Sequence, residues 1–344
     1  MVLNEVKSLG DGTEKETEGF FNLLFSHLYS LYASDGSDTK EFVNVFIRLL
    51  TDEPATQKFL KYRILSNLFN ATEHTSSIRP LVYSALVQIS SANGDIDALQ
   101  ITRTNIEKWL SNWNIAPTEK ASFLKTISGA YEAESQPEIA YEYERLYVQT
   151  LPSTSPGAQE GAIDLITTAL RLPNVFDFDP LFKLDAVISA KGHELFSLLQ
   201  IFLNDGLSEF NAWIGSHSHI LDKYNLDRAQ LEHKIRLLTF ASLALQYVGR
   251  DLPYSKVAEA LQVDVVDVEK WAIDVIRAQL VWGKLSQTTQ SLHITRATAR
   301  TFEKEQWETL QKRLLAWKSG LSGILDVVVD AKQSAGLVQP QNVA

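Results

Sequence analysis

The side chains best placed for chemistry are His217, Ser218 and His219, where two imidazoles flank a hydroxyl. Imidazole nitrogens are common zinc ligands, and a bound zinc ion can activate water for hydrolysis. A hydrolytic zinc site built on this pattern needs a further serine and an aspartate at fixed positions downstream. Those positions hold Asp227 and Gln230, so the ligand set is incomplete. We therefore expect a polar turn between helices here and no metal site.

Other motifs for catalysis or cofactor binding are missing from the sequence. The chain has no cysteine, which excludes disulfides, thiolate catalysis and cysteine-ligated zinc. It has no glycine-rich dinucleotide motif and no phosphate-binding loop, and residues 320–323 resemble a serine-hydrolase elbow in composition only. We expect a protein that is not an enzyme and that binds no cofactor.

Composition and charge limit the partners of the chain. Its 344 residues are 45% hydrophobic and carry a formal net charge of −10, which disfavours binding to duplex DNA or anionic membranes. Residues 1–19 are polar and acidic and do not resemble a signal peptide. The longest apolar stretch, 237–248, is too short to span a bilayer. We expect a cytoplasmic protein with neither duplex DNA nor a membrane as a partner.

The first two thirds of the chain have the pattern of consecutive helices. Thr13 and Glu16 form a capping box ahead of apolar residues at helical spacing, and Ser135 and Ser155 stand as caps before later helices. The further helices are predicted at 40–50, 54–69, 78–91, 96–113, 118–133, 136–151, 156–171, 180–190, 193–204 and 207–216. Short polar connections between paired helices indicate an α-solenoid. Because the repeat is weak, an irregular helical domain is the alternative.

Residues 228–300 have the element order of a winged helix. We predict a helix at 228–247, an extended piece at 252–254, helices at 255–261 (capped by Ser255) and 263–279, and strands at 280–286 and 291–295 around the turn 287–290. A DNA-reading third helix needs lysine and arginine. This one carries four acidic residues against two basic ones: Asp264, Asp267, Glu269 and Asp274 against Lys270 and Arg277. The pattern favours protein–protein assembly.

The wing suggests two kinds of contact. Its strands are too short to be stable alone, and an exposed edge strand can accept a strand from a partner. The predicted interface residues of the wing are Val281, Trp282, Leu285, Leu292 and Ile294. A contact with RNA phosphates is predicted for Lys284, Arg296 and Arg300. The alternative for the basic residues is a solvated face with Glu–Lys pairs.

The last predicted helix runs from Glu303 to about Lys332, with Thr301 as its cap. Apolar residues recur along it at alternating steps of three and four, which is a heptad seam. The seam consists of Trp307, Leu310, Leu314, Trp317, Leu321, Ile324 and Val328. We predict that this stripe contacts partner subunits. The alternative is that it packs back on its own domain.

Several segments resemble the PCI domain, a helical array that ends in a winged helix. They are LSEFNAWIGSH at 207–217 (with Phe210, Asn211, Ala212 and Trp213), HKIRLLTF at 233–240, VEKWAIDVIRAQLVWGKLSQ at 268–287, and the pairs and runs at 301–302, 306–307 and 315–318. The resemblance implies a non-catalytic scaffold subunit of eukaryotic translation initiation factor three. Its implied partners are the PCI and MPN subunits of that complex and, through the complex, the small ribosomal subunit. The signalosome and the proteasome lid are the alternative complexes.

The expected fold class is an all-α helical repeat array (α-solenoid) followed by a winged helix with a small β-wing and a long C-terminal helix, which is the PCI architecture. The expected domains are a flexible N-terminus at 1–12, the array at 13–221, the winged helix at 222–300, a bundling helix at 301–332 and a disordered tail at 333–344.

Overall fold

The computed structural model describes residues 12–52, 57–152, 155–301 and 304–334. The chain divides into two compact units, Met1–Ile235 and Arg236–Ala344, and each is described by itself. The N-terminus at 1–12 was expected to be flexible and the tail at 333–344 disordered; of these, residues 1–11 and 335–344 lie outside the described residues, and residues 333–334 instead end the last helix. The domain boundaries drawn from the sequence stay a prediction.

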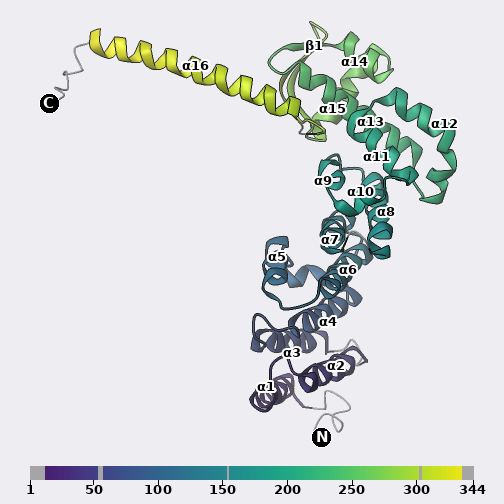
Figure 1. Ribbon diagram of the computed structural model, residues 1–344, viewed down its shortest axis with the longest axis vertical. Coiled ribbons are helices and arrows are strands. Elements are labelled where there is room, and N and C mark those ends of the chain that lie inside the picture. Colours follow the sequence, from purple (N-terminus) through teal and green to yellow (C-terminus); the bar gives the residue numbers. More distant parts are fainter. Residues whose placement is uncertain (1–11, 53–56, 153–154, 302–303, 335–344) are drawn as a thin grey trace. The chain divides into compact units, whose positions relative to one another are not determined.

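Unit 1 consists of helices whose order in space follows their order in the chain (Figure 1). Neighbouring helices pack in succession, α1 on α3, α3 on α4, α4 on α6, α6 on α7 and α7 on α8. The helices are α1 (Glu14–Leu31), α2 (Ser37–Asp52), α3 (Lys58–Ala71), α4 (Arg79–Ala92), η3 (Ile96–Leu99), α5 (Arg103–Asn112), α6 (Pro117–Ala133), α7 (Pro137–Thr150), α8 (Pro156–Arg171), α9 (Asp179–Phe182), α10 (Asp185–Ser189), α11 (Glu194–Asn204) and α12 (Leu207–Lys223). The helical array expected from the sequence is confirmed.

Local sequence signals explain where the first helix begins. The Thr13 amide donates to the Glu16 carboxylate at 2.9 Å, and the Glu16 amide donates to the Thr13 hydroxyl at 3.4 Å. This reciprocal pair is the predicted capping box, and the hydrogen bonds from Thr13 hold the pKa of Glu16 below its usual value. Phe21 and Phe25 then point into the core, where both pack against Phe46 of α2.

Three predictions about helix ends and continuity were wrong. Residues 96–113 form η3 and α5 instead of one helix, because Gln100 adopts a left-handed backbone with φ of 46° and Thr102 then caps α5. The second is 180–190, which is two short helices, α9 and α10. The third concerns the caps. Ser135 is itself left-handed, and Gln136 holds the cap position of α7. Ser155 does stand at the cap position of α8, but its hydroxyl donates to the Pro152 carbonyl instead of accepting from the helix.

Unit 2 contains the winged helix. Helix α13 (Arg228–Gln246) enters it and is followed by β1 (Asp251–Pro253), α14 (Tyr254–Leu261), η4 (Val265–Asp267), α15 (Val268–Arg277), β2 (Val281–Ser286), β3 (Ser291–Ala297) and α16 (Lys304–Ser334). The strands form an antiparallel sheet in the order β1-β3-β2. Two predicted helix starts are corrected: Pro253, not Ser255, stands at the cap position of α14, and the third helix begins at Val268 after the 3-10 turn.

One irregularity sets which side chains the wing presents on each face. Trp282 pairs with Arg296, but the next residue, Gly283, pairs with Ile294, so Thr295 is an extra residue in β3. A side chain at Gly283 would collide with the carbonyl of His293, which explains the glycine. Without the bulge, strict alternation would put Arg296 on the same face as the buried Ile294. The bulge returns Arg296 to the outward face.

Candidate interaction surfaces

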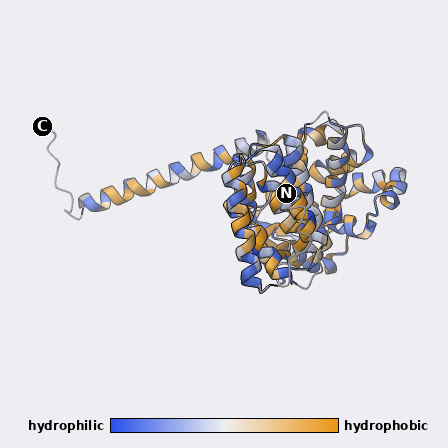
Figure 2. Ribbon diagram, turned by 90° about the horizontal axis from the view of Figure 1, so that it is seen from below, coloured by the Kyte–Doolittle hydropathy of each residue, from blue (hydrophilic) through white to orange (hydrophobic). Residues whose placement is uncertain are grey.

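Helix α16 exposes its apolar stripe. All seven predicted seam residues, from Trp307 to Val328, have side chains that are between 37% and 67% exposed. Figure 2 shows hydrophobic and hydrophilic residues alternating along the helix. Gly320 and Gly323 meet no neighbouring atoms where a side chain would stand, and each lowers helix propensity by roughly 1 kcal/mol relative to alanine. A continuous exposed apolar stripe of this length is typical of a surface that a partner covers.

The wing offers a backbone edge more than a side-chain surface. β2 lies at one edge of the sheet, and no strand pairs with its outer side within the described part of the chain. Of the predicted interface residues, Val281, Leu292 and Ile294 are fully buried, because they face the core of unit 2. Leu285 is 38% exposed and Trp282 is half-buried. Contact through the first three side chains would require unfolding the wing.

The three predicted RNA-contact residues do not lie together. Lys284 and Arg296 are exposed on the outward face of the sheet. Arg300 is turned into the protein, where its guanidinium donates to the Leu238 carbonyl at 3.1 Å and to the Thr239 hydroxyl at 3.2 Å. These bonds hold the chain after β3 against α13. The Arg300 side chain therefore stabilises the fold and does not point toward the surface that carries Lys284 and Arg296.

The acidic residues of α15 and its preceding turn are partly occupied by internal contacts. Asp267 accepts from Lys270 at 2.8 Å, and Glu269 accepts from Gln287 of the wing at 2.9 Å. Val266 stands 86% exposed beside them. The face that reads the major groove in DNA-binding winged helices thus carries acidic groups and few cations, as the sequence predicted, and an exposed valine, which it did not.

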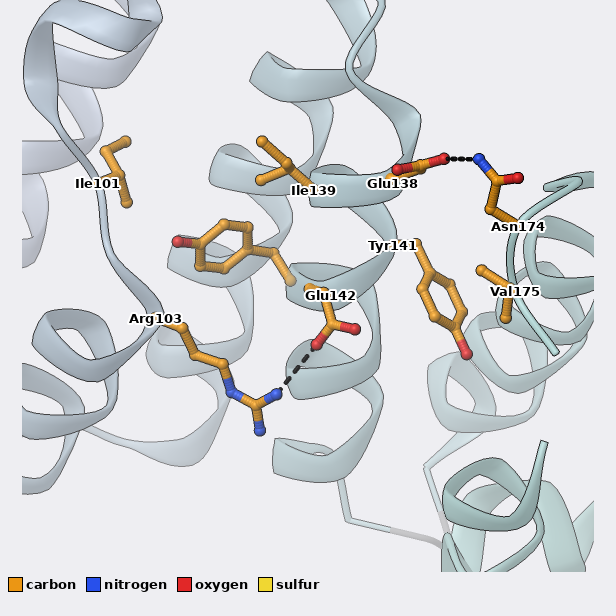
Figure 3. A pocket seen from close by; sticks show the side chains of 9 residues that line it. Ile101, Arg103, Glu138, Ile139, Tyr141, Glu142, Asn174 and Val175 are labelled. Atoms are coloured by element: carbon orange, nitrogen blue, oxygen red, sulfur yellow. Dashed lines mark hydrogen bonds and ion pairs between the residues drawn. The ribbon is translucent and has the colours of Figure 1, made fainter. Parts of the chain in front are cut away.

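Two hollows lie in the described part of unit 1. The first, with a volume of 460 Å³, lies along α7 and is lined by apolar side chains such as Ile101, Ile139 and Val175 (Figure 3). Four of its polar side chains are already paired. The Arg103 guanidinium donates to the Glu142 carboxylate at 3.0 Å. The side-chain amide of Asn174, in the loop after α8, donates to the Glu138 carboxylate at 2.7 Å. Such a hollow suits an apolar contact.

The second hollow, of 530 Å³, lies between α6, α7 and α8 and contains Glu144, whose pKa burial raises to about 7. A carboxyl group with such a pKa can serve as a general acid. Two of the nearby hydroxyls are tied to the backbone, because Ser128 donates to the Ala140 carbonyl at 3.0 Å and Thr167 donates to the Ile163 carbonyl at 2.8 Å. The Thr168 hydroxyl instead donates to the Glu144 carboxyl, and this hydrogen bond offsets part of the rise in the pKa of Glu144.

The candidate zinc motif falls at a kink in α12. His217 leaves the helical backbone, stacks on Trp213 at 4.8 Å between ring centroids and lies 2.7 Å from the Ser216 hydroxyl. His219 points instead toward Glu194, at 3.9 Å. Among the described residues, no cluster of three or more histidine, cysteine or acidic side chains is arranged to hold a metal ion.

A buried lysine was not anticipated from the sequence. Lys234 of α13 is 1% exposed, and its ammonium donates to the carbonyls of Ala169 at 2.7 Å and Leu172 at 2.6 Å, at the end of α8. The ring of Phe178 lies 5.1 Å from the ammonium. Burial lowers the pKa of Lys234 to about 7. The lysine donates hydrogen bonds to carbonyls at the end of α8 that have no amide donor within the helix.

A helical array, a winged helix whose third helix is poor in cations and an exposed terminal helix together define a class of protein. Residues 214–296 match the family model of the PCI domain, so the chain is a PCI protein. A second family model, described as the C-terminal helix of eIF3 subunit M, matches residues 300–328, which include most of α16.

The chain belongs to the family of eukaryotic translation initiation factor 3 subunit M. It is similar to the subunit M of Aspergillus oryzae, with 34% identity over 95% of this chain and 72% of that protein. The subunit M of Dictyostelium discoideum is 30% identical over 93% of this chain and 80% of that protein. That of Phaeosphaeria nodorum is 35% identical over 83% of this chain, which spans 66% of the relative's length. The predicted resemblance to the PCI domain is confirmed, and so is the prediction that the chain belongs with translation initiation factor three and not with the signalosome or the proteasome lid.

No helix among the described residues is both long enough and apolar enough to cross a bilayer.

Proposed function

We propose that this chain is a non-catalytic scaffold subunit of eukaryotic translation initiation factor three. It would support the assembly of the factor and its recruitment to the small ribosomal subunit. Family membership supports the complex. The observation that carries the scaffold role is α16, whose seven seam residues are all exposed over a helix of 31 residues. Its partners would be other PCI and MPN subunits, which the resemblance implies.

The absence of catalysis is part of the proposal. Catalysis needs a nucleophile, a base and a stabilising donor brought to one place. His217 is stacked on Trp213, the Ser128 and Thr167 hydroxyls near Glu144 bond to backbone carbonyls, and the Thr168 hydroxyl bonds to the Glu144 carboxyl itself. The chain would act by contacts alone.

A second contact is proposed at the outer edge of β2. The Ile294 amide donates to the Arg250 carbonyl on the β1 side, so alternation turns the backbone groups of His293 toward β2 and its pair Lys284. The backbone groups of Gly283 and Leu285 then point outward, where a partner strand could bond to them. This edge contact does not require exposed side chains.

We expect Leu285→Pro to weaken co-purification with the neighbouring PCI subunit, because proline removes an outward amide hydrogen and places its ring at the edge. Loss of about one hydrogen bond predicts a decrease of roughly five- to tenfold in affinity. Leu285→Ala is the matched control, since it removes the side chain and keeps the amide. Equal co-purification of the proline and alanine variants, both folded by circular dichroism, would argue against the edge contact.

A further inference from the structure

The outward face of the wing carries a group of side chains that neither proposed assembly surface uses. Trp282 and Lys284 lie on β2, and their pairing partners Arg296 and His293 lie on β3. Alternation and the bulge put all four on the face opposite the buried Val281 and Ile294. We call these four residues the wing platform.

The platform combines an aromatic ring with cations. The Arg296 guanidinium lies over the Trp282 ring, 4.5 Å from its centroid, and Arg296 is exposed while Trp282 is half-buried. A guanidinium that stacks on an indole can keep its other planar face open for a second stacking partner. The Lys284 side chain is exposed two residues further along β2. An extended chain of alternating planar and anionic groups would fit this arrangement.

The charge of the surroundings favours an anionic ligand here. Residues 1–235 contain 19 basic and 31 acidic side chains, whereas residues 236–344 contain 13 basic and 11 acidic ones. The carboxylate on the platform's face is Asp251, which lies 2.7 Å from the His293 imidazole. Glu269 of α15 reaches the wing as well, but it accepts from Gln287 at 2.9 Å. Lys284 and Arg296 are thus the cations available to phosphates.

We propose that the wing platform binds single-stranded RNA. A base would stack on the Arg296–Trp282 pair, and the adjacent phosphate would lie against Lys284. Proteins that bind single strands combine stacking surfaces with cations in this way, whereas duplex reading needs cations on the third helix, where Asp264, Asp267 and Asp274 lie. The choice of RNA over single-stranded DNA rests on the proposed function. The inference that the platform binds a single strand rests only on the positions of its side chains.

The test is fluorescence anisotropy of the full chain with a labelled single-stranded RNA of mixed sequence, roughly ten nucleotides long. Lys284→Glu and Arg296→Glu are each expected to weaken binding by roughly tenfold or more and to reduce the slope of log affinity against log salt by about 0.7. Arg296→Lys keeps the charge and loses the planar stack, so roughly tenfold weaker binding with an unchanged slope is expected. Lys270→Glu, on α15, is the matched control and should change little.

Several results would overturn the proposal. One is no binding by the unaltered chain at low salt. Another is an equal loss with Lys270→Glu, which would place the nucleic acid on α15. Equal affinity for a duplex of the same length would contradict single-strand recognition, and preference for single-stranded DNA would contradict the choice of RNA. Incorporation of the Lys284→Glu and Arg296→Glu variants into the initiation factor is measured separately, so a failure of assembly is distinguished from a failure of RNA binding.

Discussion

Replacing Leu321, Ile324 and Val328 with serine is expected to abolish incorporation of the chain into the initiation factor. The melting temperature of the isolated chain should not change, because these side chains are 44% to 62% exposed in it. Full burial of an apolar side chain of this size contributes about 2 kcal/mol, so covering the exposed half of three of them contributes about 3 kcal/mol to association. That difference corresponds to roughly a hundredfold in affinity. The measurement is co-purification of the tagged variant with the other subunits.

A control triple variant separates the seam from general hydrophobicity. Leu315, Leu325 and Val329 are also exposed, by 58%, 62% and 48%, but each lies one position beyond a seam residue. One position turns the side chain by about 100° around the helix. Changing these three to serine should leave most incorporation intact. A large decrease in the melting temperature of the seam variant would show instead that the stripe is part of the chain's own core.

The second large effect is expected from Lys234→Met. Methionine matches the length of the buried lysine stem but leaves the carbonyls of Ala169 and Leu172 without their donor. A buried unsatisfied polar group costs about 1–3 kcal/mol, so the free energy of unfolding should decrease by about 3 kcal/mol. The measurement is urea unfolding of the full chain by circular dichroism. Lys191→Met, at an exposed lysine, is the control and should be nearly neutral.

The same lysine gives a dependence on pH. Its pKa is lowered to about 7 in the folded chain from an ordinary value of 10.5, so between these values the unfolded chain binds more protons. Stability contributed by Lys234 therefore increases as pH rises through this window, by about 1.4 kcal/mol per pH unit at most. The gap in unfolding free energy between the unaltered chain and Lys234→Met should widen accordingly. A gap that is constant or narrows with pH would contradict the buried position of the ammonium.

The architecture could be predicted from the sequence because its signals are local. The capping box at Thr13 joins groups three residues apart, and the α16 seam is visible as a repeat of three and four. The wing was located from two β-rich runs around a polar turn. These patterns need no knowledge of distant contacts, and the structure has the capping box, α16 and the wing at those places.

Features that depend on distant contacts were missed. Lys234 sits 62 residues from the Leu172 carbonyl that it bonds to, and a lysine in a helix ordinarily predicts a solvated side chain. Arg300 reaches back to Leu238, which no spacing indicates. The bulge at Thr295 decides that Arg296 joins Trp282 on the outward face, and a shift of one residue reverses such an assignment. Buried and outward side chains of the wing were therefore predicted together as one interface.

Affinity purification of the tagged full chain, followed by mass spectrometry of the co-purifying proteins, tests the central claim most directly. The claim is that the chain acts as a scaffold within translation initiation factor three. The expected result is recovery of the other subunits of that factor in near-equal amounts, together with proteins of the small ribosomal subunit. Recovery of signalosome or proteasome-lid subunits in their place, or of the chain alone from cells that contain the intact factor, would contradict it.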